Sequence, residues 1–542
     1  ATTVPAHGKR QKDGQNGLLA MAPLIAAGFA KAHVIGHSMG GLIAQEVALR
    51  VRARVQSLSL LCTFHRGPEA ARITLASSGA RTPGVDGVDK ALMTETLHQE
   101  RATIRAELLA GCYKPQPARR VYIPKANGKV RPLGIPSLRD RVVQRAMLMA
   151  MEPIWESDFH RASYGFRPAR SVHHAIRTVK LQLQDSDEQR TAGRWVIEGD
   201  LASYFETVHH RLLLKGVRKR IADQRFLALL WTCIKAGCVD RGLFYAASDG
   251  VPQGGVISPL LSNIVLHEFD GWMEANYLSK KVRKDRWAWN FGILTQRPIA
   301  VRENRQWKPG VSYCRYADDF VVVVKGTKTH AAAIREACRT FLEGQLKLTL
   351  KMEKTHITHV DDGFVFLGHR IIRKRGSNGH MSVVTTIPRE KAKAFVRRLT
   401  ETLSGNHDVG KVDMVDRINR QLAGWAAFYK FTDFTARIFR RIDHVVFWKL
   451  AHWLARKYRS RIKPLMRSWY RRPEAGQAKT WLVYGRSERG NRVGKALRRM
   501  VSSPKAQFRW RNPEINPYIF RSETRSTVTS NYRDVAMAMG QG

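Results

Sequence analysis

The sequence Tyr313-Cys314-Arg315-Tyr316-Ala317-Asp318-Asp319-Phe320, followed by valines up to Val324, decides the fold of this chain. The β-branched and aromatic residues on both sides of the two aspartates favour extended strands, and the polar tip favours a turn. We therefore predict a strand, a tight turn and a second strand, with Asp318 and Asp319 at the turn.

Two adjacent carboxylates at such a turn repel each other, and burying them without a cation costs free energy. A divalent cation removes that cost, and ligands that are all oxygen suit Mg²⁺. The alternative is a solvated hairpin turn, because aspartate is common in turns. This stretch alone does not separate the two interpretations, so the rest of the chain has to decide.

A further carboxylate motif lies earlier in the chain. Trp195-Val196-Ile197-Glu198-Gly199 is an apolar strand that runs into Asp200. Acids from two separate strands can hold a pair of Mg²⁺ ions, which activate a hydroxyl nucleophile and stabilise a leaving pyrophosphate. The two motifs together therefore indicate metal-dependent nucleotidyl transfer.

The motif that ends in Asp318-Asp319 resembles the Tyr-X-Asp-Asp signature of reverse transcriptases. The motifs between residues 78 and 370 resemble those of group II intron reverse transcriptases, in the same order. The resemblance implies that Asp200, Asp318 and Asp319 hold two Mg²⁺ ions, with the backbone carbonyl of Leu201 as a further ligand. It also implies that Lys354 protonates the leaving pyrophosphate.

Two more positions in this region are expected to face the incoming nucleotide. Phe205 falls where the family places an aromatic residue that blocks a ribose 2′-hydroxyl, which would make dNTP the substrate. A core aromatic is the alternative for Phe205. Gln253 lies in residues 250–263, which resemble the family's Pro-Gln-Gly motif. Ala202 departs from the family, where a basic residue is common.

Residues 119–136 are predicted to form a β-hairpin, because Asn127-Gly128 favours a tight two-residue turn. Lys125 and Arg131 flank that turn, so both side chains can reach one anionic ligand. Polymerases need cations on the incoming triphosphate to neutralise charge in the transition state. A solvated basic hairpin is the alternative, and the resemblance to the family's fingers favours contact with the triphosphate.

The chain of 542 residues carries a net charge of +47. Such a charge attracts polyanions, so nucleic acid is the first expected partner and an anionic membrane surface is the second. No apolar run approaches the ~18 residues of a membrane-spanning helix. The six cysteines form neither a disulfide framework nor a zinc pattern. We expect a bacterial cytoplasmic protein that associates with the nucleoid and not with a membrane.

The segment from residue 371 onward holds roughly 37 Lys+Arg against roughly 12 Asp+Glu, the charge expected of an RNA-binding surface. Residues 418–429 resemble the maturase, or thumb, domain of group II intron proteins. The aromatic residues of this region recur at helical spacing, so most of them are expected in a core. The basic residues expected to contact RNA are Arg167 in the fingers and Arg456, Lys457, Arg459, Arg461 and Lys463 in the thumb.

The N-terminal segment has a different character. Gly36-His37-Ser38-Met39-Gly40 lies between a predicted strand and a predicted helix, which is the setting of a nucleophile elbow. Residues 17–72 resemble the α/β-hydrolase family. A hydrolase also needs an acid and a histidine from later strands of the same sheet, and the residues that follow carry the other motifs instead. We therefore expect Ser38 not to be catalytic.

These observations predict an α+β chain with the right-hand architecture of a polymerase. Residues 1–75 would form a truncated α/β-hydrolase fragment, 78–370 the fingers and palm, 371–520 the α-helical thumb, and 521–542 a tail. We expect an RNA-directed DNA polymerase and maturase that binds group II intron RNA, assists its splicing and copies it from a DNA primer with dNTPs. The alternatives are a splicing-only maturase and a serine hydrolase with an RNA-binding extension.

Overall fold

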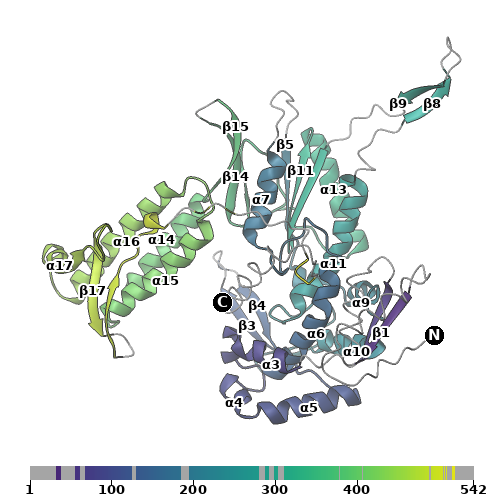
Figure 1. The fold of residues 1–542 in the computed structure, drawn as a ribbon, viewed down its shortest axis with the longest axis horizontal. Helices are drawn as coiled ribbons and strands as arrows, with labels where there is room; N and C mark the ends of the chain where they lie inside the picture. The colour runs from purple at the N-terminus through teal and green to yellow at the C-terminus, as the bar shows by residue number, and fades with distance from the viewer. Residues whose placement is uncertain are drawn as a thin grey trace, which may run out of the picture.

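The fold combines a mixed α and β body with a helical domain at one side (Figure 1). The computed structural model describes residues 32–37, 55–61, 67–124, 128, 130–184, 194–279, 287–291, 298–302, 310–376, 379–405, 407–486, 490–503, 506, 508 and 516–518. The α+β class and the separate helical thumb agree with the prediction.

A four-stranded antiparallel sheet in the order β10-β11-β5-β12 forms the palm. Its strands are β5 (Arg194–Gly199), β10 (Gly310–Tyr316), β11 (Asp319–Lys325) and β12 (Ile357–His359). The strands predicted on both sides of Asp318 and before Asp200 are therefore confirmed.

The valine run of β11 explains how this sheet is buried on both faces. Val321 and Val323 pack with helix α7 on one face, whereas Val322 and Val324 pack with helices α11 and α13 on the other. Side chains alternate between the two faces of a strand, so a continuous β-branched run fills both cores. These helices are α7 (Val172–Leu183), α11 (Ser258–Met273) and α13 (Lys328–Gln345).

The fingers contain a second sheet, in the order β4-β3-β6-β7, below the palm in Figure 1. Its strands are β3 (Ala118–Pro124), β4 (Val130–Ile135), β6 (Cys238–Asp240) and β7 (Leu243–Tyr245). The hairpin predicted at residues 119–136 is confirmed as β3 and β4. The helices around both sheets are η3 (Ser78–Arg81), α4 (Lys90–Glu95), α5 (Leu97–Ala110), α6 (Leu138–Glu156), α8 (Tyr204–Thr207), α9 (His210–Arg218), α10 (Gln224–Lys235) and η4 (Glu274–Leu278).

Helix α3 (Gly67–Ala76) lies at the end of the predicted hydrolase-like segment and packs against the fingers. Ala70 and Leu75 are buried in one cluster with Leu138 and Val142 of α6. Small and branched apolar side chains on one face of α3 require such a partner. Residues before the predicted boundary at 75 therefore already share a hydrophobic cluster with α6.

Upstream of α3 the structure describes two strands, β1 (Ala32–His37) and β2 (Val55–Leu61). The first is the strand predicted before the elbow, and the two pair in parallel, as strands joined by a crossover do in an α/β-hydrolase fragment. Ser38 lies outside the described residues, and so does the predicted tail at 521–542.

The thumb has its own hydrophobic core, in which Trp453 and Trp481 are buried. Its helices are α14 (Arg389–Leu403), α15 (Lys411–Tyr429), α16 (Thr435–Lys457), α17 (Ile462–Trp469) and η5 (Met500–Ser502). A small sheet adds β16 (Tyr470–Arg471), β17 (Thr480–Arg486) and β18 (Arg492–Ala496). The predicted aromatic core is confirmed, although the region also contains strands that the prediction lacked.

A three-stranded sheet of β13 (Phe364–Phe366), β14 (His369–Arg375) and β15 (Met381–Thr386) joins the palm to the thumb. Lys180 of α7 pairs with Asp433, which also accepts a hydrogen bond from the backbone of Thr385. The C-terminal side of the thumb returns to the body, because Phe508 packs against His174. The thumb is therefore attached to the body at both of its ends.

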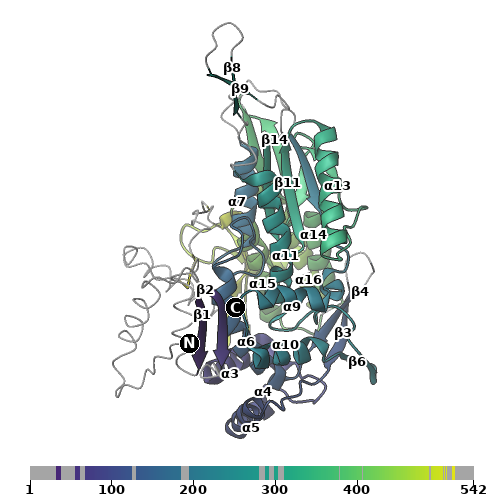
Figure 2. The ribbon, with the colours of Figure 1, turned by 90° about the vertical axis from the view of Figure 1, so that its right-hand side faces the viewer.

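The hairpin of β8 (Trp287–Phe291) and β9 (Pro298–Arg302) projects from the body on the side away from the thumb (Figures 1 and 2). Among the described residues, no helix combines the length and the apolar character that crossing a bilayer requires.

Candidate active site

The predicted catalytic turn is a two-residue connection between β10 and β11. Tyr316 and Asp319 form the last pair of the two strands, so Ala317 and Asp318 make the turn itself. Ala317 has a φ of +56°, the left-handed conformation that side chains disfavour. The turn places Asp318 at its tip and Asp319 at the start of β11.

The register of the sheet brings Asp200 to the same place. Phe320 of β11 pairs with Gly199 of β5, and because the strands are antiparallel, Asp319 and Asp200 follow on the same side. Gly199 is required here, since a Cβ at this position would lie 2.2 Å from the ring of Phe320. Three acids from two separate motifs therefore meet at one edge of the palm sheet.

The acidities of the turn carboxylates show that these charges act on one another. Burial raises the pKa of Asp318, the charge of Asp200 raises it further, and Arg131 lowers it. Burial and the charges of Asp318 and Asp200 raise the pKa of Asp319 to about 7. Asp319 is exposed, but enough protein surrounds its carboxylate to disfavour the ionised form. The nearby cations therefore do not offset the burial of the turn carboxylates and the repulsion among the three acids.

Lys354 supplies one cation to this group. Its Nζ lies 2.8 Å from Oδ2 of Asp200, and this hydrogen bond raises the pKa of Lys354. The segment before it is fixed by the backbone, because Ala202 N donates to Thr349 O and Lys351 N donates to Asp200 O. The structure therefore brings the predicted Lys354 to the predicted acids.

The donor set fits Mg²⁺ in its chemistry. Asp200, Asp318 and Asp319 offer only oxygen, and the backbone of Leu201 lies next to them in a bridge to Leu350. In the part of the chain that the structure describes, no three His, Cys, Asp or Glu side chains lie close enough together to hold a metal ion in the arrangement shown. Burial and then mutual repulsion raise the pKa values of the turn carboxylates, and a bound cation would offset both effects.

The nucleotide-facing residues surround these acids. Phe205 on α8 is half-buried, and its ring meets the exposed Phe166 edge-on, at 6.3 Å between centroids. Arg131 is exposed on β4 and close enough to lower the pKa of Asp318. Phe166, which the sequence analysis did not select, presents an aromatic face beside the predicted Phe205.

Gln253 docks on the fingers sheet through its backbone. Its carbonyl accepts a hydrogen bond from Gly134 N at 2.8 Å, and a Cβ on Gly254 would lie 2.5 Å from Gly134 O. A cavity of about 460 Å³ lies beside Gln253, between this loop and the sheet face that carries Arg120 and Tyr122. Lys125 lies outside the described residues.

Arg167 does not contact a template phosphate, which corrects the prediction. Its side chain is only 1% exposed and pairs with the equally buried Glu156 through two hydrogen bonds. Two backbone carbonyls, of His160 and Ser163, accept its remaining hydrogen bonds. These four hydrogen bonds and the burial of the side chain keep the guanidinium away from solvent and RNA, so Arg167 stabilises the fingers core.

The predicted thumb cations differ in their availability. Arg456, Arg459, Arg461 and Lys463 are exposed. Lys457 is half-buried, and its Nζ donates to the carbonyl of His407 at 2.5 Å. Further exposed side chains on α16 extend this surface, namely Arg437, Arg440, Arg441, Trp448 and Lys449.

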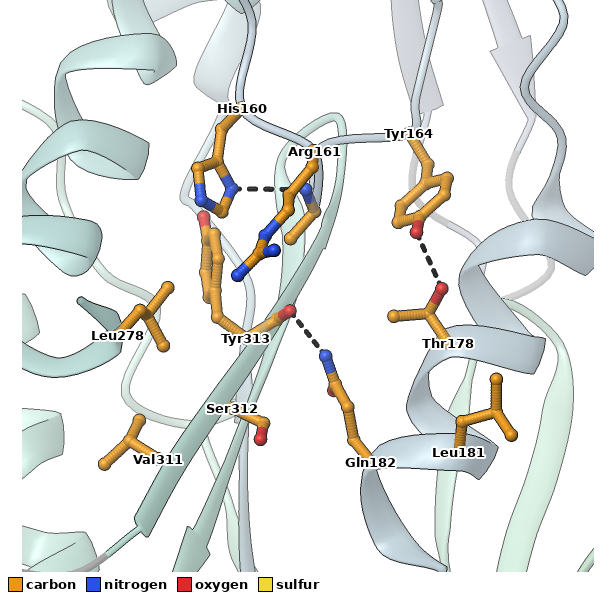
Figure 3. Close-up of a pocket in the computed structure, with 11 residues that line it drawn as sticks. His160, Arg161, Tyr164, Thr178, Leu181, Gln182, Leu278, Val311, Ser312 and Tyr313 are labelled. Atoms are coloured by element: carbon orange, nitrogen blue, oxygen red, sulfur yellow. Dashed lines mark hydrogen bonds between the residues drawn. The ribbon is translucent and has the colours of Figure 1, made fainter. Parts of the chain in front are cut away.

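A cavity of about 390 Å³ lies at the end of β10 that is farther from the turn (Figure 3). Tyr313 of β10 lines it, and Gln182 of α7 donates to the Tyr313 carbonyl at 2.9 Å. None of the predicted site residues lines it. The contact at this cavity supports the site only indirectly. Gln182 of α7 bonds to the outer edge of β10 and helps to fix the strand that leads to the catalytic turn.

Comparison with known proteins agrees with this geometry. The family described as reverse transcriptase (RNA-dependent DNA polymerase) matches residues 123–371. The maturase-specific domain of group II introns matches residues 392–469. Protein YkfC of Escherichia coli (strain K12) is 69% identical over 351 residues, which cover 65% of this chain and 92% of YkfC.

This chain belongs to the family of group II intron-encoded reverse transcriptases and maturases. Group II intron-encoded protein LtrA of Lactococcus lactis is 30% identical over 370 residues, and the match spans 59% of each chain. Nuclear intron maturase 2 of Arabidopsis thaliana is 23% identical over 412 residues, which span 60% of this chain and 53% of that protein. The palm and fingers thus correspond to the reverse transcriptase, and α14 to α17 correspond to the maturase-specific domain of this family.

The family described as alpha/beta hydrolase fold matches residues 19–103, which supports the predicted hydrolase-like segment. That match overlaps α3, α4 and the first half of α5. In the structure, however, Ala70, Met93 and Ile104 from these helices are buried in clusters of the polymerase body. Helices α3 to α5 therefore pack with the fingers and palm, although α3, α4 and the start of α5 fall within the hydrolase-like match.

Proposed function

We propose that this protein is an RNA-directed DNA polymerase and intron maturase. It binds group II intron RNA, assists the splicing of that RNA, and copies it into cDNA from a DNA primer with dNTPs. The meeting of Asp200, Asp318 and Asp319 at one edge of the palm sheet, beside Lys354, is the observation that supports this most. The bacterial cytoplasm near the nucleoid would supply both the intron transcript and the primed DNA.

The roles of the palm residues follow from their positions. Two Mg²⁺ ions at Asp200, Leu201 O, Asp318 and Asp319 would activate the primer 3′-hydroxyl and stabilise the leaving pyrophosphate. Lys354 lies beside Asp200 with a raised pKa, so it is protonated at neutral pH and can give its proton to the pyrophosphate.

The fingers would hold the nucleotide. Arg131 faces the acids from β4 and would neutralise the triphosphate together with Lys125. Gln253 would contact the nucleotide from the loop that docks on β4. Phe205 would block a ribose 2′-hydroxyl, and its contact with the exposed Phe166 supports a position at the surface of the site and not deep in the core.

The maturase role rests on the thumb. Exposed arginines and lysines on α16 and α17 give it a basic surface, and RNA phosphates would bind there with a strong salt dependence. Trp448 is exposed among these cations, so a base or a ribose can pack on its ring. Charge and an aromatic face on one helix suit single-stranded or looped RNA.

The first experiment tests polymerisation. Purified protein with Mg²⁺, an RNA template and a DNA primer should incorporate dNTPs. Replacing Asp318 or Asp200 with Ala should lower incorporation by several orders of magnitude, because the metals hold most of the transition-state charge. Glu343→Ala, on the exposed side of α13, is the matched control. Full activity in Asp318→Ala or Asp200→Ala would show that the metal assignment is wrong.

The second experiment separates the two roles. Asp319→Ala should still bind intron RNA and promote splicing, because the thumb surface is unchanged. Wild-type protein that promotes splicing but incorporates no dNTP would instead support a maturase without significant polymerase activity.

A further inference from the structure

One arginine that the sequence analysis did not select lies directly behind the catalytic turn. Arg315 on β10 is fully buried, and its guanidinium pairs with the fully buried Asp270 of α11. The two groups share two hydrogen bonds, Nε to Oδ1 at 2.8 Å and Nη2 to Oδ2 at 2.6 Å. Such a bidentate pair fixes the orientation of the guanidinium plane.

The remaining donors of Arg315 are aimed at the turn and its surroundings. Nη1 donates to the carbonyl oxygen of Ala317 and to Oδ1 of Asn263, each at 2.9 Å. Nη2 also donates to Oγ of Ser163 at 2.9 Å. Ala317 directly precedes Asp318, so the guanidinium is bonded to the backbone of the turn that carries the two acids.

The bond to Ala317 holds a conformation that an alanine does not favour. Ala317 has a positive φ, for which a residue with a Cβ needs support from its surroundings. On the other side of the turn, a Cβ on Gly165 would lie 2.3 Å from Ala317 N. Asn263 donates through Nδ2 to Gly165 O at 2.8 Å, so Asn263 and Arg315 together enclose the turn.

The strand that carries Arg315 is itself fixed at its outer edge. Arg315 N donates to Ala162 O, and Tyr164 N donates to Arg315 O. Farther along the strand, Gln182 caps the carbonyl of Tyr313 (Figure 3). The backbone that carries the Arg315 side chain is therefore fixed at the outer edge of β10.

We propose that Arg315 is a positioning residue for the catalytic carboxylates. Held by Asp270 and Asn263, it keeps Ala317 in the left-handed conformation that aims Asp318 and Asp319 at Asp200. This proposal rests on the proposed polymerase function. It also concerns cation binding by the turn, which can be measured without polymerisation.

The kinetic test compares two buried arginines. Arg315→Lys keeps the charge but cannot bond Asp270 and Ala317 together, so we expect kcat to fall about 100-fold while the KM for dNTP changes less than about threefold. Arg167→Lys is the matched control, because Arg167 is also a buried arginine paired with one carboxylate but does not touch the turn. We expect it to lower the melting temperature to a similar extent and to leave kcat within about threefold of wild type.

A rescue variant separates positioning from general stability. In the Arg315→Lys background, Ala317→Gly removes the steric cost of the positive φ, and we expect it to recover at least about fivefold in kcat. An unchanged kcat in Arg315→Lys, or an equal fall in Arg167→Lys, would overturn the proposal. So would a double variant no more active than Arg315→Lys alone.

Terbium(III) luminescence gives a readout that does not need polymerisation. Terbium binds carboxylate sites, and Tyr316 next to the turn can sensitise its emission. We expect Asp318→Ala to abolish the sensitised signal and Arg315→Lys to weaken terbium binding about tenfold. Where Arg315→Lys does not fold, Asn263→Ala removes one support of the turn and keeps the buried charge pair. Wild-type terbium affinity in the folded variant would overturn the proposal, even if the protein proves not to polymerise.

Discussion

The Nζ of Lys354 lies 2.8 Å from Oδ2 of Asp200, so a cation from the loop after residue 350 pairs with the acid at the end of β5. The pair joins two segments that are 154 residues apart in the sequence. Its side chains remain partly open to solvent, and the pair therefore adds little to stability. The role of this pair is to keep the ammonium group of Lys354 beside the carboxylates of the palm.

Replacing Lys354 with Ala should lower kcat about 100-fold, as expected for the loss of a general acid. The pH–rate profile should also lose its alkaline limb, because that limb reports deprotonation of Lys354. Lys374→Ala, an exposed lysine on β14, should leave kcat and the profile unchanged. Equal kcat in Lys354→Ala and wild type would remove Lys354 from the mechanism.

Mg²⁺ should stabilise the protein more at about pH 8 than at about pH 6. The folded-state pKa of Asp319 is about 7, which is above the ordinary aspartate value. At a pH between the ordinary pKa and about 7, the metal-free folded protein therefore binds more protons than the unfolded chain. The contribution of Asp319 to stability is therefore present at low pH and is lost as the pH rises through 7. Mg²⁺ binds the ionised form and reverses that loss.

The measurement is the melting temperature with and without Mg²⁺ across this pH range. Asp319→Asn removes the titrating group, so its Mg²⁺-dependent shift should be small and nearly independent of pH. A wild-type shift that is the same at both ends of the range would contradict the expected linkage.

Acid should destabilise the junction between palm and thumb through His369. This side chain is buried against Phe428 and Tyr429, and burial lowers its pKa to about 4. The unfolded chain takes up a proton first, so the stability that neutral His369 gives is complete above about pH 6.5 and is lost toward pH 4. The loss should be on the order of 3 kcal/mol.

Urea unfolding at about pH 7.5 and about pH 5 checks this expectation. His369→Gln cannot take up a proton, so its free energy of unfolding should change less between the two pH values than that of wild type. An equal change in both proteins would assign the acid sensitivity to other groups.

Charge reversal of exposed thumb cations should weaken intron RNA binding and flatten its salt dependence. Each lost phosphate contact should reduce the slope of log K against log salt by about one unit. Arg459→Glu and Arg461→Glu should show this effect, whereas Lys457→Glu should reduce stability instead, because Lys457 Nζ is bonded to the carbonyl of His407. The measurement is the affinity for intron RNA over a series of salt concentrations, with splicing followed in parallel. An unchanged slope would place the RNA surface elsewhere.

Arg167→Ala should act on stability and not on RNA contact. Removing the guanidinium leaves the buried Glu156 with the more distant Arg170 Nε, 3.7 Å away, in place of its two hydrogen bonds to Arg167, so the free energy of unfolding should fall by about 3 kcal/mol. The slope of RNA affinity against salt, measured on protein that remains folded, should equal that of wild type. A slope reduced by about one unit would restore Arg167 as a phosphate contact.

The strands around the acids could be predicted because local pattern and tertiary environment agree there. The valine run of β11 is apolar on both faces, and the sheet is buried on both faces. The order of the motifs then predicted that Asp200 and Asp318 meet. The strand register decides which residues of neighbouring strands lie opposite each other, and the sequence alone did not predict that register.

The assignment of Arg167 failed because basic residues in a chain of this charge look alike in the sequence. A buried guanidinium needs a carboxylate partner, and Glu156 lies on α6, where nothing in the local pattern distinguishes it from a surface acid. For Arg315 a signal was present, because a charged residue interrupts an otherwise buried strand. Asp270, on a helix with a largely buried apolar surface, was the corresponding signal for its partner.

The contact between Gly199 and Phe320 has a consequence for how this sequence can change. The ring of Phe320 occupies the space that any side chain at position 199 would need. An alanine at 199 would push the ring aside and, with it, the neighbouring residue Asp319. Residues 199 and 320 can therefore be substituted only together. Both lie in the hydrophobic interior, yet a mutation at either one would lower catalytic activity.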